Sequence, residues 1–486
     1  MPEQERDIVA RVPKQLYIAG AWRDGSGGRT LGVEDPSTGE VLCDVADATP
    51  EDAMAALDAA CAMQAEWART PPRDRGEILR RAFEELIERT EELAILMTLE
   101  MGKPLPEARG EIAYAADYLR WYSEEAVRIC GQYAVAANGA SRMLTMKQPV
   151  GPCVLITPWN FPMAMGTRKI GPAVAAGCTM VVKPAKQTPL CMLALADILE
   201  RAGLPGGVCN VITSSSSGSV MAPLIGDPRT RKLSFTGSTE VGRKLIAQAS
   251  EQILRVSMEL GGNAPFIVFD DADLDAAVEG ALLAKMRNIG EACTAANRFL
   301  VHETVAPEFA RRLAERMGAM TIGRGTADGV TVGPLIDQPS IDKVAELVGD
   351  AVQRGGRVLT GGGPTGDRGY FFEPTVIADV PADARVLTEE IFGPVAPITT
   401  FATEEEALAR ANATEYGLVA YFYTQDLNRA MRVIEGLDTG MVGVNQGMVS
   451  NAGAPFGGVK QSGYGREGGR EGIDEYLALK YAAINL

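Results

Sequence analysis

The fold is decided by three short apolar runs: Cys153-Val154-Leu155-Ile156, Met180-Val181-Val182 and Lys232-Leu233-Ser234-Phe235. A fourth run covers residues 208–212, and helical patterns separate the runs, for example at 190–201. Strands that are apolar almost throughout and alternate with helices are typical of a parallel, doubly wound sheet. We therefore predict an α/β fold that binds ligands at the carboxyl ends of these strands.

The sequence on either side of these runs predicts further parts. Helical patterns at 50–68, 75–100 and 104–129 precede the sheet, and a second α/β region runs from about 262 to 460. A chain of 486 residues is long enough for two or three domains. The run at 476–486 resembles a terminal strand, and we expect it to pair with another subunit.

Composition excludes several classes of function. The formal charge of −16 argues against nucleic acid or an anionic membrane as the main partner. We find no apolar stretch long enough to cross a membrane and no secretion signal, so we expect a cytoplasmic protein. The eight cysteines form no C-x-x-C pair, which argues against a metal site. Because His302 is the only histidine, we expect any general base to be a carboxylate.

Two motifs follow predicted strands. In Phe235-Thr236-Gly237-Ser238-Thr239-Glu240-Val241-Gly242, a glycine turn opens a helix, an arrangement that can bind phosphate. Taken alone, a purely structural turn is about as consistent with this run. Glu259 follows a strand and precedes Gly261 and Gly262, which suits either a base on a mobile loop or an ordinary solvated carboxylate.

Two further motifs carry a thiol and an amide. Cys293 lies in Gly290-Glu291-Ala292-Cys293-Thr294, whose polar flanks suit a loop, although a lone cysteine is more often a buried filler. Asn160 lies between two prolines in Pro158-Trp159-Asn160-Phe161-Pro162. The prolines fix the backbone, so the amide can point a donor at an oxyanion.

Together these motifs resemble those of the aldehyde dehydrogenase superfamily, in the family's order and over nearly the whole chain. Glu259 precedes Cys293 by 34 residues, as in the family pattern. Lys183-Pro184-Ala185, Glu389-Glu390-Ile391-Phe392-Gly393-Pro394 and Pro455-Phe456-Gly457-Gly458 also fit.

The resemblance implies a mechanism. Cys293 as a thiolate attacks the aldehyde carbon, and the Asn160 side chain with the Cys293 N–H binds the oxyanion. Hydride then leaves for a nicotinamide, and Glu259 activates the water that hydrolyses the thioester. A regulatory second cysteine of some relatives is replaced here by Ala295.

The resemblance also implies a cofactor site. Its residues are Trp159, Lys183, Gly237, Ser238, Gly242, Glu390 and Phe392. Lys186 stands where relatives that prefer NAD often have a glutamate. Because a lysine attracts a 2′-phosphate that a carboxylate repels, we predict a preference for NADP, with NAD possible. A plain surface lysine is the alternative interpretation of Lys186.

Two spacings point to the substrate. Arg168 lies eight residues after Asn160, and Arg287 lies six before Cys293, positions that face the substrate tunnel in the family. Two guanidinium groups there form a carboxylate clamp, to which Ser450 can add a hydroxyl. This constellation resembles the branch of the family that oxidises succinate semialdehyde. A five-carbon semialdehyde would suit the same clamp, and pairing of one arginine with an acid such as Glu291 is the structural alternative.

The predicted organisation follows from the same resemblance. We expect a Rossmann-like cofactor domain, a second α/β catalytic domain and a small β element that makes a homodimer or homotetramer. The boundaries are 1–129 and 150–259 for the first, 260–460 for the second, and 130–149 and 461–486 for the third.

Proteins of other classes would need a different set of residues. A non-catalytic relative would not need the Cys293, Glu259 and Asn160 set. A dehydrogenase that passes the acyl group to coenzyme A would not need Glu259 as a water base. A thiol hydrolase would not need the phosphate-binding turn or Lys183.

Overall fold

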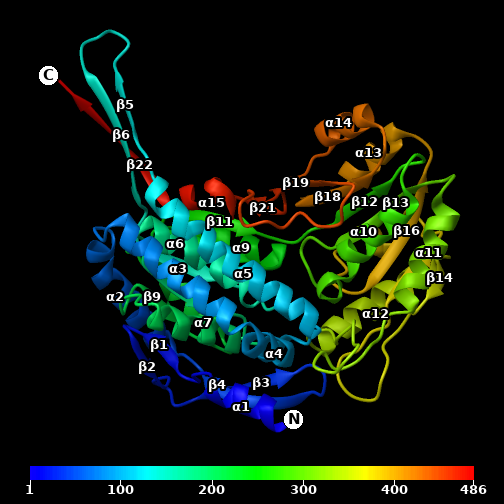
Figure 1. The fold of residues 1–486 in the computed structure, drawn as a ribbon, viewed down its shortest axis with the longest axis horizontal. Helices are drawn as coiled ribbons and strands as arrows, with labels where there is room; N and C mark the ends of the chain where they lie inside the picture. The colour runs from blue at the N-terminus through cyan, green and yellow to red at the C-terminus, as the bar shows by residue number, and fades with distance from the viewer. Residues whose placement is uncertain (486) are drawn as a thin grey trace.

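A computed structural model describes residues 1–485 and contains two large sheets side by side (Figure 1). The first has eight strands, and the predicted apolar runs form its parallel centre. Its strands are, in spatial order, β2 (Ala21–Arg23), β1 (Leu16–Ile18), β9 (Cys209–Val211), β8 (Met180–Lys183), β7 (Cys153–Ile156), β10 (Lys232–Thr236), β11 (Arg255–Glu259) and β21 (Gly463–Tyr464).

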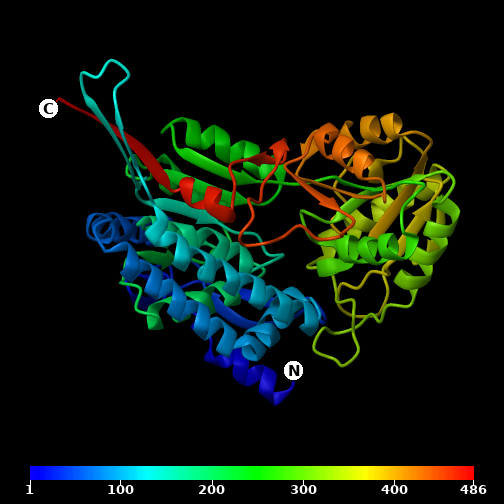
Figure 2. The same ribbon diagram turned by 45° about the horizontal axis from the view of Figure 1, so that its top comes forward.

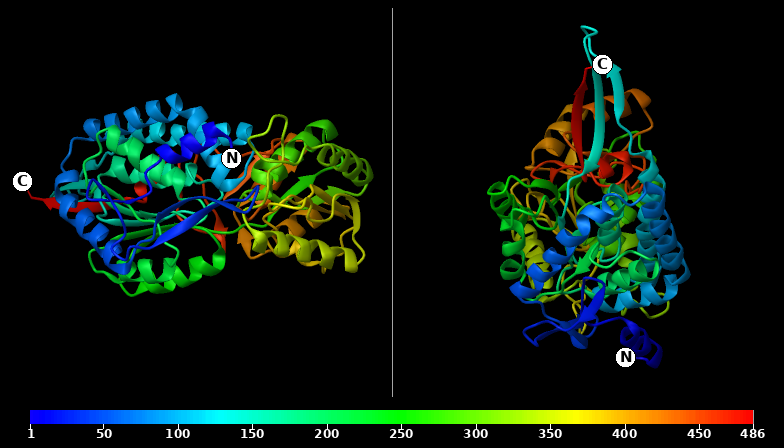
Figure 3. Two further views of the ribbon diagram at one scale, coloured as in Figure 1. Left: turned by 90° about the horizontal axis from the view of Figure 1, so that it is seen from below. Right: turned by 90° about the vertical axis from the view of Figure 1, so that its left-hand side faces the viewer.

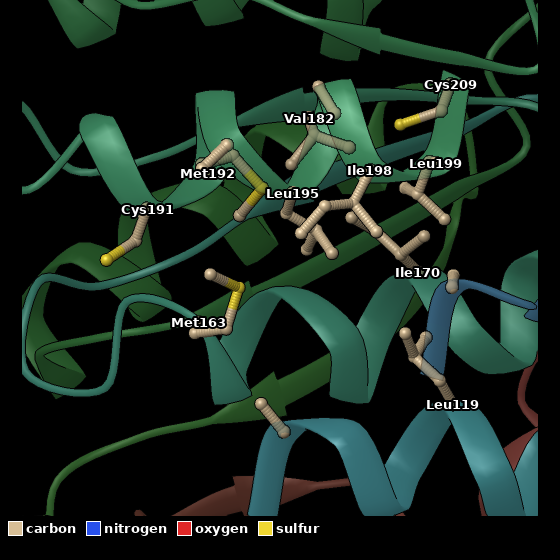
Figure 4. Packing of buried hydrophobic residues seen from close by; sticks show 14 of the residues in the cluster. Leu119, Met163, Ile170, Val182, Cys191, Met192, Leu195, Ile198, Leu199 and Cys209 are labelled. Atoms are coloured by element: carbon tan, nitrogen blue, oxygen red, sulfur yellow. The ribbon is translucent and has the colours of Figure 1, made fainter. Parts of the chain in front are cut away.

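Helices cover both faces of this sheet, because successive side chains of each central strand point to opposite sides. Cys153 and Leu155 of β7 pack into one core, and Val154 and Ile156 pack into the other. Figure 4 shows the first core between α6, α7 and the sheet. The helices of this half are α2 (Pro50–Trp67), α3 (Pro72–Glu88), α4 (Thr90–Met101), α5 (Leu105–Glu125), α6 (Ala164–Ala176), α7 (Leu190–Arg201), α8 (Ser217–Gly226) and α9 (Thr239–Ser250).

The second sheet has seven strands and is parallel except at β14. Its strands are, in spatial order, β14 (Arg357–Thr360), β15 (Thr375–Ala378), β16 (Val395–Phe401), β13 (Ala296–His302), β12 (Ala264–Val268), β18 (Val419–Tyr423) and β19 (Met441–Val444). Its helices are α10 (Leu274–Met286), α11 (Ala306–Gly318), α12 (Gln338–Gln353), α13 (Glu404–Asn412) and α14 (Leu427–Gly436). The predicted fold class, two α/β units with a smaller β element, is confirmed.

The small β element is an arm that projects from the first unit (Figures 1 and 3). It consists of β22 (Leu477–Ile484), β6 (Arg142–Pro149) and β5 (Gln132–Val135), paired antiparallel. Tyr133 and Tyr481 on the arm are 65% and 58% exposed, a large apolar area for a protein surface. The last residue of the predicted terminal strand, Leu486, lies outside the described residues.

Two details differ from the sequence-based expectation. The single helix predicted at 75–100 is two helices, α3 and α4, because Arg89 leaves the helical conformation between them. Residues 461–486 do not all belong to the arm: β21 pairs with β11 of the first sheet, and α15 (Gly469–Asp474) packs on α5 and α6. Figure 2 shows this C-terminal segment returning from the second unit to the first.

The remaining elements are short or peripheral. They are α1 (Glu3–Arg11), the hairpin of β3 (Thr30–Asp35) and β4 (Glu40–Ala46), the pair β17 (Tyr416–Gly417) and β20 (Val459–Lys460), and the 3-10 turns at Ala126–Arg128, Arg287–Gly290 and Arg385–Leu387. None of the helices within residues 1–485 combines the length and the apolar character that crossing a membrane requires.

Candidate functional site

A cavity of about 240 Å³ lies at the carboxyl ends of β7, β10 and β11, where a doubly wound sheet binds its ligand. It gathers predicted residues from both halves of the chain. They are Trp159, Asn160, Gly237, Ser238, Glu259, Cys293, Glu390 and Phe392. The strand ends supply the first five, and loops of the second unit supply the other three.

Cys293 lies in a loop between the 3-10 turn and β13, and it is partly exposed in the cavity. The loop begins with Asn288 and Ile289 in the left-handed region, at φ 55° and 60°. Burial raises the pKa of the Cys293 thiol to about 12, although the nearby charge of Arg168 acts in the opposite direction. A raised pKa favours the protonated thiol, so attack as a thiolate would use a base that accepts the Cys293 proton.

Both the side chain and the backbone carbonyl of Asn160 are held by hydrogen bonds. Its side-chain Nδ2 donates to the Glu291 carbonyl at 3.0 Å, and its Oδ1 accepts from the Phe161 N–H at 3.1 Å. Its backbone carbonyl accepts from Lys103 Nζ at 2.8 Å and from Asn288 Nδ2 at 3.1 Å. The amide therefore already lies against the Cys293 loop.

Glu259 ends β11 and is 2% exposed. Neither of its carboxylate oxygens has a hydrogen-bond partner within residues 1–485. Burial, together with the charge of Glu467, raises its pKa well above the usual range, which suits a group that takes up a proton.

The surroundings of Glu259 include two residues that sequence reasoning missed. The buried Lys169 donates from Nζ to Glu467 Oε1 at 2.5 Å and to Ser234 Oγ at 2.9 Å. Glu467 follows Gly465-Arg466, a run without a chemical signature, so only the fold brings it beside Glu259.

The residues predicted to bind the dinucleotide line one side of the cavity. Ser238 caps α9 by accepting from the Val241 N–H at 3.4 Å. Glu390 Oε1 accepts from the Gly262 N–H at 2.9 Å, and Phe392 stands edge-on to Trp159 with 5.5 Å between ring centroids. Lys343, which sequence reasoning missed, also lines this side.

Other predicted cofactor residues lie outside this cavity. Lys183 ends the neighbouring strand β8 and is 4% exposed; burial and the charge of Lys186 lower its pKa to about 8. Lys186 itself is exposed. Gly242 packs against Leu260, where an added Cβ would come within 2.5 Å of a side-chain carbon. The N-terminus of α9, with Gly242 in its first turns, can bind the phosphates of a nicotinamide dinucleotide. Lys183 and Lys186 add two cations nearby.

A second cavity of about 290 Å³ adjoins the first at Phe161. Arg287 and Ser450 line it together, with Arg287 Nη1 donating to Ser450 Oγ at 3.3 Å. The guanidinium carbon lies 4.9 Å from the centroid of the Phe161 ring. Glu291 does not pair with Arg287, because its carboxylate is buried and accepts from the Ile336 N–H at 3.1 Å.

Arg168 requires a correction. The prediction placed its guanidinium beside that of Arg287, yet Arg168 does not line this cavity. Because α6 is buried along its whole length, the Arg168 charge needs an internal partner, and it pairs with Glu467 and stacks at 4.2 Å over Phe456. Its buried Nε and Nη2 make no hydrogen bond within residues 1–485, so the guanidinium keeps unused donors.

Two alternatives lose support from the geometry. His302 ends the seven-residue strand β13, about 20 Å from the start of that strand at the usual rise per residue, and its ring nitrogens contact Thr304 and the Ala402 carbonyl, so it does not form a Cys–His pair with Cys293. Within residues 1–485, no cluster of side chains is suited to hold a metal ion.

Comparisons with known proteins identify the family of the chain. Residues 22–482 match the aldehyde dehydrogenase family. A succinate-semialdehyde dehydrogenase of Paenarthrobacter nicotinovorans is 61% identical over 91% of this chain and 99% of its own length. A glutarate-semialdehyde dehydrogenase of Pseudomonas aeruginosa is 51% identical over 97% of each chain. The crystal structure of an E. coli NADP-dependent enzyme, 50% identical, superposes with a TM-score of 0.97 over 98% of each chain. The chain therefore belongs to the aldehyde dehydrogenase family.

Proposed function

We propose that this dehydrogenase oxidises succinate semialdehyde to succinate, with NADP as the preferred cofactor. One observation carries the choice of substrate: the Arg287–Ser450 pair lies in a cavity that meets the Cys293 cavity at Phe161. A short aldehyde bound between them would place its carboxylate on Arg287 and its carbonyl at Cys293. Arg168, whose charge acts on the Cys293 thiol, lines neither cavity.

The catalytic roles follow from the environment of each group. Cys293 attacks the aldehyde carbon after its proton has been removed. Among the described residues that line the cavity, the carboxylates are Glu259 and Glu390, and Glu390 already accepts from the Gly262 N–H, so Glu259 is the base. The Asn160 amide and the Cys293 N–H then stabilise the oxyanion. When bound, the nicotinamide accepts a hydride. After releasing the thiol proton to solvent, Glu259 takes a proton from water, and the resulting hydroxide adds to the thioester carbon, which releases the acid and the Cys293 thiolate.

The cofactor proposal rests on charge. Gly237 and Ser238 at the start of α9 would hold the pyrophosphate, and Glu390 would bind the nicotinamide ribose. Lys186 and Lys183 would meet a 2′-phosphate on the adenine ribose. The similarity to an NADP-dependent E. coli enzyme supports this choice.

Glutarate semialdehyde is the alternative substrate. It carries the same carboxylate on a chain one carbon longer, and a relative named for it is 51% identical. The two candidates differ only in the distance between carboxylate and carbonyl, so the distance from Arg287 to Cys293 would select between them.

We also propose that the exposed arm pairs two or more copies of the chain. An arm with this much exposed aromatic surface requires a covering partner in solution. Light scattering would distinguish a dimer or tetramer from a monomer, and a monomer at micromolar concentration would contradict the proposal.

The deciding experiment compares kcat/KM for succinate semialdehyde, glutarate semialdehyde and butanal, each with NADP and NAD. We expect succinate semialdehyde with NADP to give the highest value and butanal the lowest. Replacing Lys186→Glu should lower kcat/KM with NADP much more than with NAD, because the new carboxylate repels the 2′-phosphate. A preference for butanal would contradict the substrate, and a strong preference for NAD in the unaltered enzyme would contradict the cofactor.

A further inference from the structure

One face of a helix holds both loops that carry the predicted oxyanion donors. Glu107 and Glu111 lie four residues apart in the first turns of α5 and share a face, and Lys103 lies in the loop just before α5. All three line the cavity of Arg287, but none belongs to a motif that the sequence analysis used. Each contacts a loop of the Cys293 cavity through a hydrogen bond to backbone.

Lys103 and Glu111 form hydrogen bonds to backbone groups of the segment that contains Asn160. The two side chains form an ion pair in which each is 1% exposed. Lys103 Nζ donates to the Asn160 carbonyl at 2.8 Å, and it lies 4.2 Å from the centroid of the Phe161 ring. Glu111 Oε1 accepts from the N–H groups of Met163 and Ala164, at 3.0 and 3.1 Å. The pair therefore fixes the segment at both ends.

Glu107 forms a hydrogen bond to the backbone of the turn that precedes Cys293. Its Oε2 accepts from the Asn288 N–H at 2.5 Å, where the backbone adopts the left-handed conformation. The Asn288 side chain then donates from Nδ2 to the carbonyls of Asn160 and Glu291, at 3.1 and 2.8 Å. These bonds join the Asn160 segment to the loop that leads into Cys293.

From these contacts we infer that Lys103, Glu107 and Glu111 are positioning residues that hold the Asn160 amide in register with the Cys293 N–H. An oxyanion site requires its two donors to be placed within about 0.5 Å of the productive geometry. The donors come from loops 133 residues apart (160 and 293), and α5 contacts both. The inference rests on the role proposed for Asn160.

A simple test must avoid an unpaired buried charge, because removing one member of a buried ion pair destabilises a fold by about 3–5 kcal/mol. The variant is therefore the double replacement Lys103→Met with Glu111→Gln. It keeps the side-chain volumes and an oxygen acceptor for Met163 and Ala164, and it removes only the charge and the bond to the Asn160 carbonyl.

We expect this double variant to lower kcat for succinate semialdehyde by about 10- to 100-fold, the cost of a small misplacement of reacting groups. KM and the dissociation constant of NADPH, measured by its fluorescence, should change by less than about threefold, since neither depends on the oxyanion. The control is Arg109→Met with Glu91→Gln, which removes an exposed ion pair between α5 and α4. It should leave kcat unchanged.

The decisive comparison repeats the Lys103/Glu111 replacement in an Asn160→Ala background. If the pair acts through Asn160, the replacement should lower kcat less than about threefold there, because positioning a missing amide has no value. An equal loss in both backgrounds, or a lower Tm with unchanged kcat, would overturn the inference. If Asn160→Ala alone left kcat unchanged, the role proposed for Asn160 would fail first. If Asn160→Ala lowered kcat and the double variant did not, only the positioning role would fail.

Discussion

The two cavities that meet at Phe161 are built in different ways. The cavity at Cys293 is lined by strand ends and motif loops, and its ionisable groups are forced toward their neutral forms, since burial raises the pKa of both Cys293 and Glu259. The cavity at Arg287 is lined mainly by side chains of α5, together with the basic side chains of Lys103 and Arg287, and the Lys103–Glu111 ion pair lies in its wall. The first is suited to chemistry on any aldehyde, and the second to selecting a charged one.

The largest effect should come from Cys293→Ala. Loss of a covalent nucleophile lowers kcat by something on the order of 10⁶-fold, and the loss should be the same for charged and uncharged aldehydes. Cys130→Ala, at an exposed cysteine, is the matched control and should keep full activity. Steady-state reduction of the cofactor at 340 nm measures both variants. Substantial residual oxidation by Cys293→Ala would contradict the covalent route.

Glu259→Gln should lower kcat by about 10²- to 10⁴-fold, the usual contribution of a general base. A base acts in its deprotonated form, and burial raises the pKa of Glu259, so activity of the unaltered enzyme should increase with pH through a range well above 4.5. The variant should lose this rise. Stopped-flow traces of the variant should show no rapid first turnover, because the Cys293 thiol also loses its proton acceptor. An unchanged pH profile would assign the base to another group.

Arg287→Met separates the two cavities. Hydrogen bonds to a charged group contribute about 1.5–3 kcal/mol, so kcat/KM for succinate semialdehyde should fall by about 10- to 100-fold, chiefly through KM. The value for butanal should stay nearly constant, because butanal has no carboxylate. Arg287→Lys, which keeps the charge, is the control and should lose less. Equal losses for both aldehydes would mean that Arg287 supports the Cys293 loop instead.

Ser450→Ala should have the smallest effect. A neutral hydrogen bond contributes about 0.5–1.5 kcal/mol, so kcat/KM for the semialdehyde should fall by about 2- to 10-fold with kcat unchanged. Because Ser450 contacts Arg287, the losses in the Arg287→Met and Ser450→Ala double variant should not add. Fully additive losses would show that the two residues act separately.

The sequence predicted most of what lies at the strand ends. The apolar runs at 153–156 and 232–235 became neighbouring parallel strands, and the motifs that follow them met in one cavity. Such predictions succeed because a buried strand is apolar almost throughout, which the sequence shows directly. They also succeed because the carboxyl ends of parallel strands share one edge of the sheet.

Long-range partners could not be predicted in this way. Spacing alone placed Arg168 and Arg287 in one tunnel. In the structure, Arg168 instead pairs with Glu467, 299 residues further along the chain, and does not line the cavity of Arg287. Nothing around Lys103, Glu107 or Glu111 marks them as neighbours of Asn160 and Asn288. A buried charge takes the partner that the packing provides, and packing is a property of the whole chain.

By itself, then, the sequence determined the α/β fold, the family, and the identity of the thiol, carboxylate and amide in the cavity. Only the tertiary structure decided how those groups are held: which charges pair, which carboxylate loses its partners, and which helix face aligns the two loops. Local patterns record whether a residue is buried, whereas ionisation and hydrogen bonding depend on distances of a few ångströms between distant segments.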